Sequence, residues 1–92
     1  MNLYWMASDN AARVAELYRY LRSGDAVVFI FDGCGWLTEG RLLYPLPKPV
    51  SWYAVLTHCQ CRSIVIPAEV TAIDMQQLAQ LTVQYASCCY LT

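Results

Sequence analysis

The sequence has few charged residues and no long apolar run. Charged side chains make up 14% of the 92 residues, whereas soluble domains typically carry about 25%. The segment Ala26–Phe31 is continuously apolar, but a membrane-spanning helix needs ~20 such residues. We therefore expect no membrane partner, although 58% of the residues are apolar.

A domain of this length cannot hide so much apolar material within itself. Small domains bury only about 60–65% of the surface that the unfolded chain exposes. The sequence contains seven Tyr and three Trp, which are residue types enriched at protein interfaces. The surplus of apolar side chains therefore predicts a surface that another subunit covers.

Positive charge is also scarce, since six Lys and Arg stand against seven Asp and Glu. Without a basic stripe to neutralise phosphates, direct nucleic-acid binding is not expected. The first ten residues, MNLYWMASDN, contain no basic residue and no long apolar core. We therefore expect no signal peptide and a cytoplasmic location. In that reducing compartment the five cysteines are expected to remain thiols.

Apolar periodicity and capping residues predict an alternation of strands and helices. An apolar stripe of helical spacing contains Val14, Leu17, Tyr18 and Leu21. The expected elements are a strand at Leu3–Met6, a helix over about 10–22, strands at Ala26–Phe31 and Val50–Leu56, a helical turn at Thr57–Arg62, a last strand at Val70–Ile73 and a helix after Asp74.

The final helix carries the clearest start signal. Asp74 with Gln77 three residues later forms a capping-box pattern. The face expected to be buried holds Met75, Leu78, Thr82 and Tyr85, with Leu81 adjoining it. Between the strands, residues 36–43 suggest a short helix or an irregular segment. The three prolines of 44–49 predict an extended loop. The tail 86–92 has no clear pattern.

The alternating order predicts an α/β fold with a mainly parallel sheet and helices packed on it. Right-handed crossovers would produce a small three-layer, flavodoxin-like domain. Residues 1–92 are expected to form this single domain.

Three cysteines are weak candidates for chemistry. Cys59 and Cys61, next to His58, suggest a redox dithiol, a persulfide carrier or part of a metal site. On a helix, however, positions 59 and 61 lie about 200° apart, and one C-x-C pair is no zinc signature. Cys34 lies in a Gly-rich turn after a strand, where a thiol can become reactive. The alternative for all three is simple packing, because free cysteine is among the most buried residue types.

No other catalytic, cofactor-binding or metal motif is recognisable in the sequence. The segment Asp32–Gly35 lacks the spacing of a phosphate-binding loop. Cys88 and Cys89 are adjacent, so their side chains are expected to point apart. From the residues alone, the chain is an α/β interaction subunit without a demonstrable catalytic site, and no cofactor is expected.

Three stretches together resemble the TusB/DsrH family. Leu21–Ala26 running into Val28–Gly33 is similar to its "L…GD…LLL…DG" segment. Tyr53–Val55 followed by Arg62 is similar to "VYAL…ARG", and Ile73–Tyr85 is similar to "VDY..FV.LTV.H". The order and spacing hold over nearly the whole chain, although no single motif is specific.

This resemblance implies a DsrE-like fold and a cytoplasmic sulfur relay. TusB-type chains assemble with TusC- and TusD-type sisters into a heterohexamer. The complex passes persulfide sulfur, by way of a TusE-like acceptor, towards 2-thiouridine at the tRNA wobble position. DsrH-type relatives belong to a sulfur-oxidising version of the assembly.

This chain has no cysteine at the two positions that correspond to the cysteines of the family. The cysteine that DsrH-type chains can carry in the first helix corresponds to Leu17, and the sulfur-carrying cysteine of the TusD-type sister corresponds to about Val55. We therefore predict a non-catalytic subunit, with Trp36, Trp52 and Tyr53 at its interface. The alternatives are a stand-alone or DsrEFH-type sulfurtransferase that carries persulfide on Cys59, Cys61 or Cys34, and a metal or redox sensor.

Overall fold

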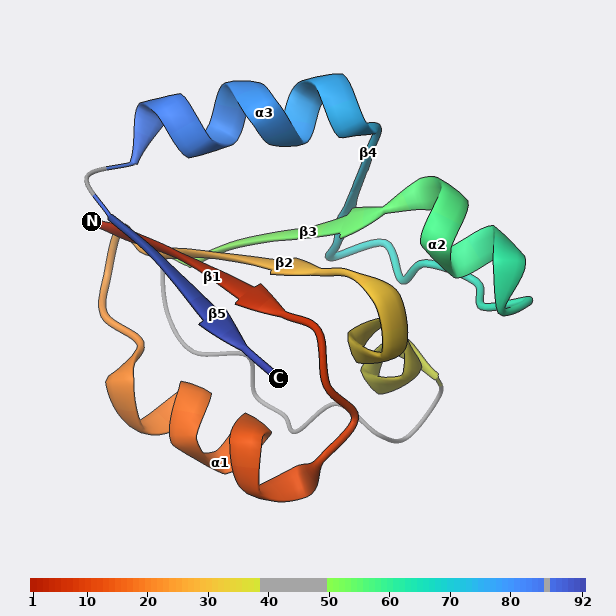
Figure 1. Ribbon diagram of the computed structural model, residues 1–92, viewed down its shortest axis with the longest axis horizontal. Coiled ribbons are helices and arrows are strands. Elements are labelled where there is room, and N and C mark those ends of the chain that lie inside the picture. The colour runs from red at the N-terminus through yellow and green to blue at the C-terminus, as the bar shows by residue number, and fades with distance from the viewer. Residues whose placement is uncertain (39–49, 86) are drawn as a thin grey trace.

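The computed structural model describes residues 1–38, 50–85 and 87–92. These residues form a five-stranded sheet in the order β4-β3-β2-β1-β5, with every neighbouring pair parallel (Figure 1). The strands are β1 (Asn2–Met6), β2 (Ala26–Phe29), β3 (Ser51–Val55), β4 (Thr71–Ile73) and β5 (Ser87–Leu91). The predicted parallel sheet is confirmed.

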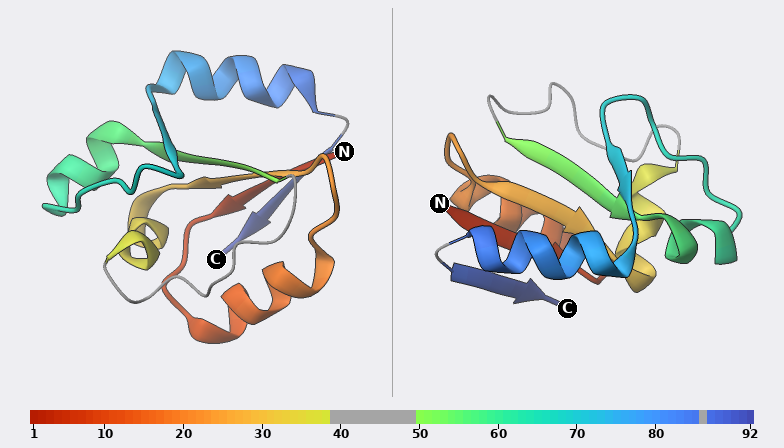
Figure 2. Two further views of the ribbon diagram at one scale, coloured as in Figure 1. Left: turned by 180° about the vertical axis from the view of Figure 1, so that it is seen from behind. Right: turned by 90° about the horizontal axis from the view of Figure 1, so that it is seen from above.

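Helices lie on both faces of the sheet. Helix α1 (Ala11–Tyr20) covers one face and α3 (Met75–Gln84) covers the other, as Figures 1 and 2 show. The 3₁₀-helix η1 (Phe31–Leu37) and the short helix α2 (Leu56–Cys61) follow β2 and β3. The chain thus has the expected small, three-layer, flavodoxin-like α/β architecture.

The two faces of the sheet enclose two separate apolar cores, because successive side chains of a strand point to opposite faces. On the α1 side, Val27 and Phe29 pack with Val14 and Leu17. On the α3 side, the buried residues are Leu3, Ala26, Val28, Ile30, Val55, Ile73, Leu78 and Leu81. Strand β2 is buried along its whole length, as its continuous apolar sequence predicts.

Both predicted helix starts are confirmed. The side chain of Asn10 accepts from the Ala12 amide at 2.9 Å, and Asp74 forms a full capping box with Gln77. The predicted buried face of α3 needs a correction. Leu78 and Leu81 are its buried residues, whereas Met75 is 56% exposed, because the helix turns the flank with Met75 away from the sheet.

Three predicted boundaries differ from the structure. The strand expected at Ala26–Phe31 ends at Phe29, because Phe31 turns the chain with a φ of 47°. The prediction that 70–73 is the last strand is wrong, since the tail forms β5 at the edge of the sheet. The segment 36–43, which was predicted to be a short helix or irregular, is helical only as far as Leu37. Its residues from 39 onward and the predicted loop at 44–49 lie outside the described residues.

A buried carboxylate fixes the turn between α1 and β2. Asp25 is 3% exposed and accepts hydrogen bonds from the backbone N–H groups of Asn2 at 2.9 Å and Arg22 at 3.0 Å. Gly24 before it has a φ of 89°, which favours glycine. This turn therefore ties the beginning of β1 to the beginning of β2. Among the described residues, no helix has the length and apolar character to cross a membrane.

Candidate functional site

The segments that follow β2 and β3 meet at the carboxyl edge of the sheet. The two strands are parallel neighbours, with Phe29 opposite Ala54, so η1 and α2 emerge side by side (Figure 1). Open α/β sheets place their ligand sites at this edge. The elements η1 and α2 are therefore the natural place to look for chemistry.

Close backbone packing shapes the η1 turn. A Cβ atom on Gly33 would lie 1.8 Å from the carbonyl oxygen of Met6, so only glycine fits there. Two residues earlier, Phe31 has a φ of 47°, in the left-handed region that side chains other than glycine rarely adopt. Such a conformation persists only when surrounding contacts hold it.

His58 on α2 provides that contact for Phe31. The Phe31 amide donates to Nδ1 of His58 at 3.1 Å, and the two rings stack with centroids 4.7 Å apart. Because Nδ1 accepts, the proton of the neutral imidazole lies on Nε2. Burial, and next the positive charge of Arg62, lower the pKa of His58 below its usual 6.5. His58 is thus a neutral, positioned side chain.

An exposed ion pair connects the end of α2 to η1, at the junction where these two elements meet. Arg62 Nη2 lies 3.1 Å from Asp32 Oδ1, and Arg62 Nη1 donates to the His58 carbonyl at 3.3 Å. The Asp32 side chain is 72% exposed, so the pair stabilises the fold by at most about 1 kcal/mol. Its effect is to hold the end of α2 against the beginning of η1.

Two thiols are buried beneath this junction. Cys34 and Cys59 are both 0% exposed, and their side chains are close enough to hydrogen-bond. The Cys34 thiol also donates to the Phe29 carbonyl at 3.6 Å. Burial, and then Cys59, raise the pKa of Cys34 to about 12, and burial raises the pKa of Cys59. At neutral pH both are protonated, so neither is an accessible nucleophile.

The remaining cysteines are not gathered with this pair. Cys61 ends α2 and is exposed while Cys59 is buried, in agreement with their predicted opposite orientations. Cys88 is exposed and Cys89 half-buried on β5. Within the described ranges, no group of three His, Cys, Asp or Glu side chains is arranged to hold a metal ion.

The aromatic side chains that were expected at an interface have different environments. Trp36 is 7% exposed and donates from Nε1 to the Ser8 carbonyl at 2.8 Å. Trp52 is 6% exposed and its ring stacks on Phe29 at 6.0 Å. Both rings therefore pack within the chain's own core, and their place at a subunit interface stays a prediction. Tyr53 is half-buried and lines a cavity of about 270 Å³ beside α3.

The positions that correspond to the family thiols also lie in the core. Leu17 is 1% exposed on the α1 side of the sheet, and Val55 is 0% exposed on the α3 side. Each packs as an apolar side chain. Neither position could present a reactive group to solvent without a local rearrangement.

Sequence patterns did not indicate the pairing of Phe31 with His58 or of Asp32 with Arg62. Their local patterns carry no motif. A usable signal was topological, because each pair combines a residue just after β2 with one soon after β3. Adjacent parallel strands bring such positions together.

No protein-family model matches the chain, and no curated protein matches it. The chemistry of this edge follows from its residues alone. Its exposed rim presents Phe31 and an ion pair, while its two buried thiols are protonated packing groups. Neither buried thiol of this edge is therefore an accessible nucleophile in the folded chain.

Proposed function

We propose that this chain is a non-catalytic subunit of a TusBCD-like sulfur-relay complex that acts in 2-thiolation of the tRNA wobble uridine. The observation that carries the proposal is the burial of Cys34 and Cys59 at the carboxyl edge. Persulfide transfer needs a thiolate that a donor and an acceptor can both reach. Neither thiol meets this requirement.

The segments that resemble TusB/DsrH chains have clear structural tasks in this fold. Gly24 and Asp25 make the turn that joins α1 to β2. Asp74 caps α3, and Leu78 buries that helix against the sheet. These residues shape the domain, which supports a structural subunit over a carrier.

Exposed apolar side chains at the carboxyl edge support a protein partner there. Phe31 is 47% exposed and Leu56, at the start of α2, is 41% exposed. In the proposed assembly, TusC- and TusD-like sisters cover such side chains in a heterohexamer. A sister subunit carries the sulfur and passes it to a TusE-like acceptor. This chain contacts no nucleic acid directly.

Cys61 favours a second candidate function. It is the exposed cysteine of α2, two residues beyond Cys59. A sulfurtransferase in its own right would carry persulfide there. Incubation with a cysteine desulfurase and cysteine would then add about 32 Da, the mass of one sulfur atom, to Cys61.

Co-expression with the TusC- and TusD-like chains of the same genome tests the proposed function. We expect a tagged copy of this chain to capture both sisters. The double substitution Phe31→Glu with Leu56→Glu places charge on the edge and should abolish capture. Val83→Glu is the matched control, because Val83 is 85% exposed on α3. If the wild-type chain captures neither sister, the proposal is wrong.

A further inference from the structure

We propose that β5 forms the contact strand of a symmetric dimer of this chain. In this dimer the two β5 strands pair antiparallel about a two-fold axis that passes at Cys89, and the two sheets become one. This contact between two copies is independent of any sister subunit, and the backbone and side chains of the sheet edge define it.

Within residues 1–38, 50–85 and 87–92, strand β5 shows neither charge nor proline that would protect it as an edge strand. In the sheet it pairs with β1 alone. Its sequence, SCCYL, contains no proline and no charged residue. Natural edges are usually guarded by charge, proline or a bulge, because unpaired backbone groups invite another strand.

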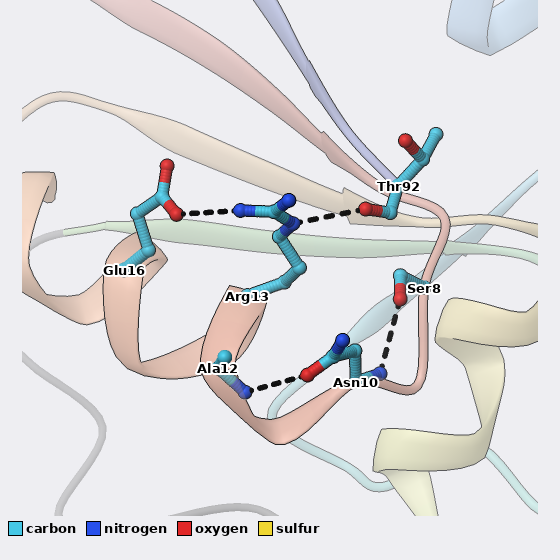
Figure 3. A network of polar contacts seen from close by, with 6 residues as sticks. All are labelled: Ser8, Asn10, Ala12, Arg13, Glu16 and Thr92. Atoms are coloured by element: carbon cyan, nitrogen blue, oxygen red, sulfur yellow. Dashed lines mark hydrogen bonds and ion pairs between the residues drawn. The ribbon is translucent and has the colours of Figure 1, made fainter.

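Side-chain contacts tie both ends of β5 to the domain behind it. At its beginning, the Ser87 hydroxyl contacts the Asn2 side-chain oxygen. Beyond its end, Arg13 Nε donates to the Thr92 carbonyl at 3.0 Å, while Glu16 holds the same guanidinium at 2.9 Å (Figure 3). A strand fixed at both ends loses little further entropy when a second strand pairs with it.

One hydrogen bond determines which backbone groups of β5 face outward. The Ala7 N–H donates to the Leu91 carbonyl at 2.9 Å, so the backbone groups of Leu91 point towards β1. In a strand, the N–H and C=O of one residue point to the same side, and those of the next residue point to the other. Cys88 and Tyr90 therefore direct their N–H and C=O groups away from the sheet.

These outward groups are self-complementary. In an antiparallel pair centred at Cys89, Cys88 of one copy lies opposite Tyr90 of the other. Each of the two such pairs exchanges two N–H···O=C bonds. All outward backbone groups of Cys88 and Tyr90 are then satisfied. Because the two contacts are related by the two-fold axis, the pairing closes as a dimer.

The side chains fit this register. Tyr90 is 55% exposed and its ring lies 6.2 Å from that of Trp5, so dimerisation covers an aromatic surface. Cys89 lies opposite its own copy in a non-hydrogen-bonded pair, for which Cα atoms are ~4.5 Å apart. This separation is within the roughly 4.4–6.8 Å range of disulfides. Cys89 is therefore a reporter of the register.

Light scattering of the purified chain in reductant tests dimer formation, and diamide tests the register. Each cross-link joins two Cys89 sulfur atoms, and the two protons and two electrons reduce diamide to its hydrazine. We expect a non-covalent dimer and a diamide-linked dimer. Cys89→Ser should abolish the link and keep the non-covalent dimer, whereas the matched variant Cys88→Ser should keep both.

Tyr90→Pro tests the backbone contact directly. Proline removes an outward N–H, which an edge strand tolerates, so we expect at least a tenfold weaker dimer with cooperative unfolding retained. Tyr90→Ala, which keeps the N–H, is its control. If Tyr90→Pro unfolds the chain, the diamide-linked dimer and its loss in Cys89→Ser test the proposed pairing instead. A monomeric wild-type chain, or a link that persists in Cys89→Ser, would overturn the proposal.

Discussion

The backbone N–H of Phe31 donates to Nδ1 of His58 across 3.1 Å and joins the end of β2 to helix α2. The same two residues stack their rings at 4.7 Å. The contact supports Phe31 in a left-handed conformation that residues other than glycine rarely adopt. His58 is thereby explained as a positioning residue for the turn.

The stability of the fold should fall in mild acid because of His58. Its folded pKa is lowered below the usual 6.5, so the unfolded chain binds a proton first. The stabilising contribution is present above pH ~6.5 and is lost as the pH falls towards the folded pKa. His58→Asn places a non-titrating acceptor near the position of Nδ1. Urea unfolding from pH 7.5 to 5 should show a shallower decline in the variant, and equal slopes would contradict this assignment.

Gly33→Ala should destabilise the chain severely. The new Cβ would lie 1.8 Å from the Met6 carbonyl oxygen, which belongs to the backbone of β1 and cannot move aside. We expect a loss of about 3 kcal/mol or more in the free energy of unfolding. Gly24→Ala is the comparison, because there the strain comes mainly from a φ of 89° and costs about 1–2 kcal/mol. Equal losses in the two variants would show that the close approach is absent.

The five thiols should divide by accessibility in a labelling experiment. Cys61 and Cys88 are exposed, whereas Cys34 and Cys59 are 0% exposed. With a thiol reagent at pH 7.5, we expect the buried pair to react at least about a hundredfold more slowly, since labelling requires the structure to open. Denaturant should remove the difference. Rapid labelling of Cys59 in the folded chain would contradict its burial and support Cys59 as a persulfide carrier.

Trp36→Ala should weaken the fold itself. The indole is 7% exposed, and its N–H donates to the Ser8 carbonyl. Truncation of a buried tryptophan costs about 3–5 kcal/mol, whereas Trp36→Phe, which loses the hydrogen bond and keeps an aromatic ring, should cost about 1–2 kcal/mol. Urea unfolding measures both. An unchanged stability together with lost assembly would return Trp36 to the interface.

The architecture could be predicted because its signals are local. The run Ala26–Phe31 and the Asp74–Gln77 capping box each determine an element without knowledge of the remainder. Strand β5 was missed because its residues show no alternation of apolar and polar side chains. An edge strand with one neighbour and partial exposure leaves little pattern in the sequence.

The candidate site was less accessible to prediction because it depends on tertiary contacts. Composition indicates that apolar side chains exceed what a small core holds, but it does not say which ones. Trp36 and Trp52 fill the core, while Leu56 and Tyr90 are exposed. Likewise, nothing local to Cys34 or Cys59 shows that the two thiols are buried against each other.

We propose that this chain joins a sulfur-relay assembly without carrying sulfur. The most direct measurement is the intact mass of every chain in the purified co-expressed assembly after incubation with a cysteine desulfurase and cysteine. We expect a gain of about 32 Da on a sister subunit and none on this chain. A sulfur adduct on Cys34, Cys59 or Cys61 would contradict it, as would an assembly that forms without this chain.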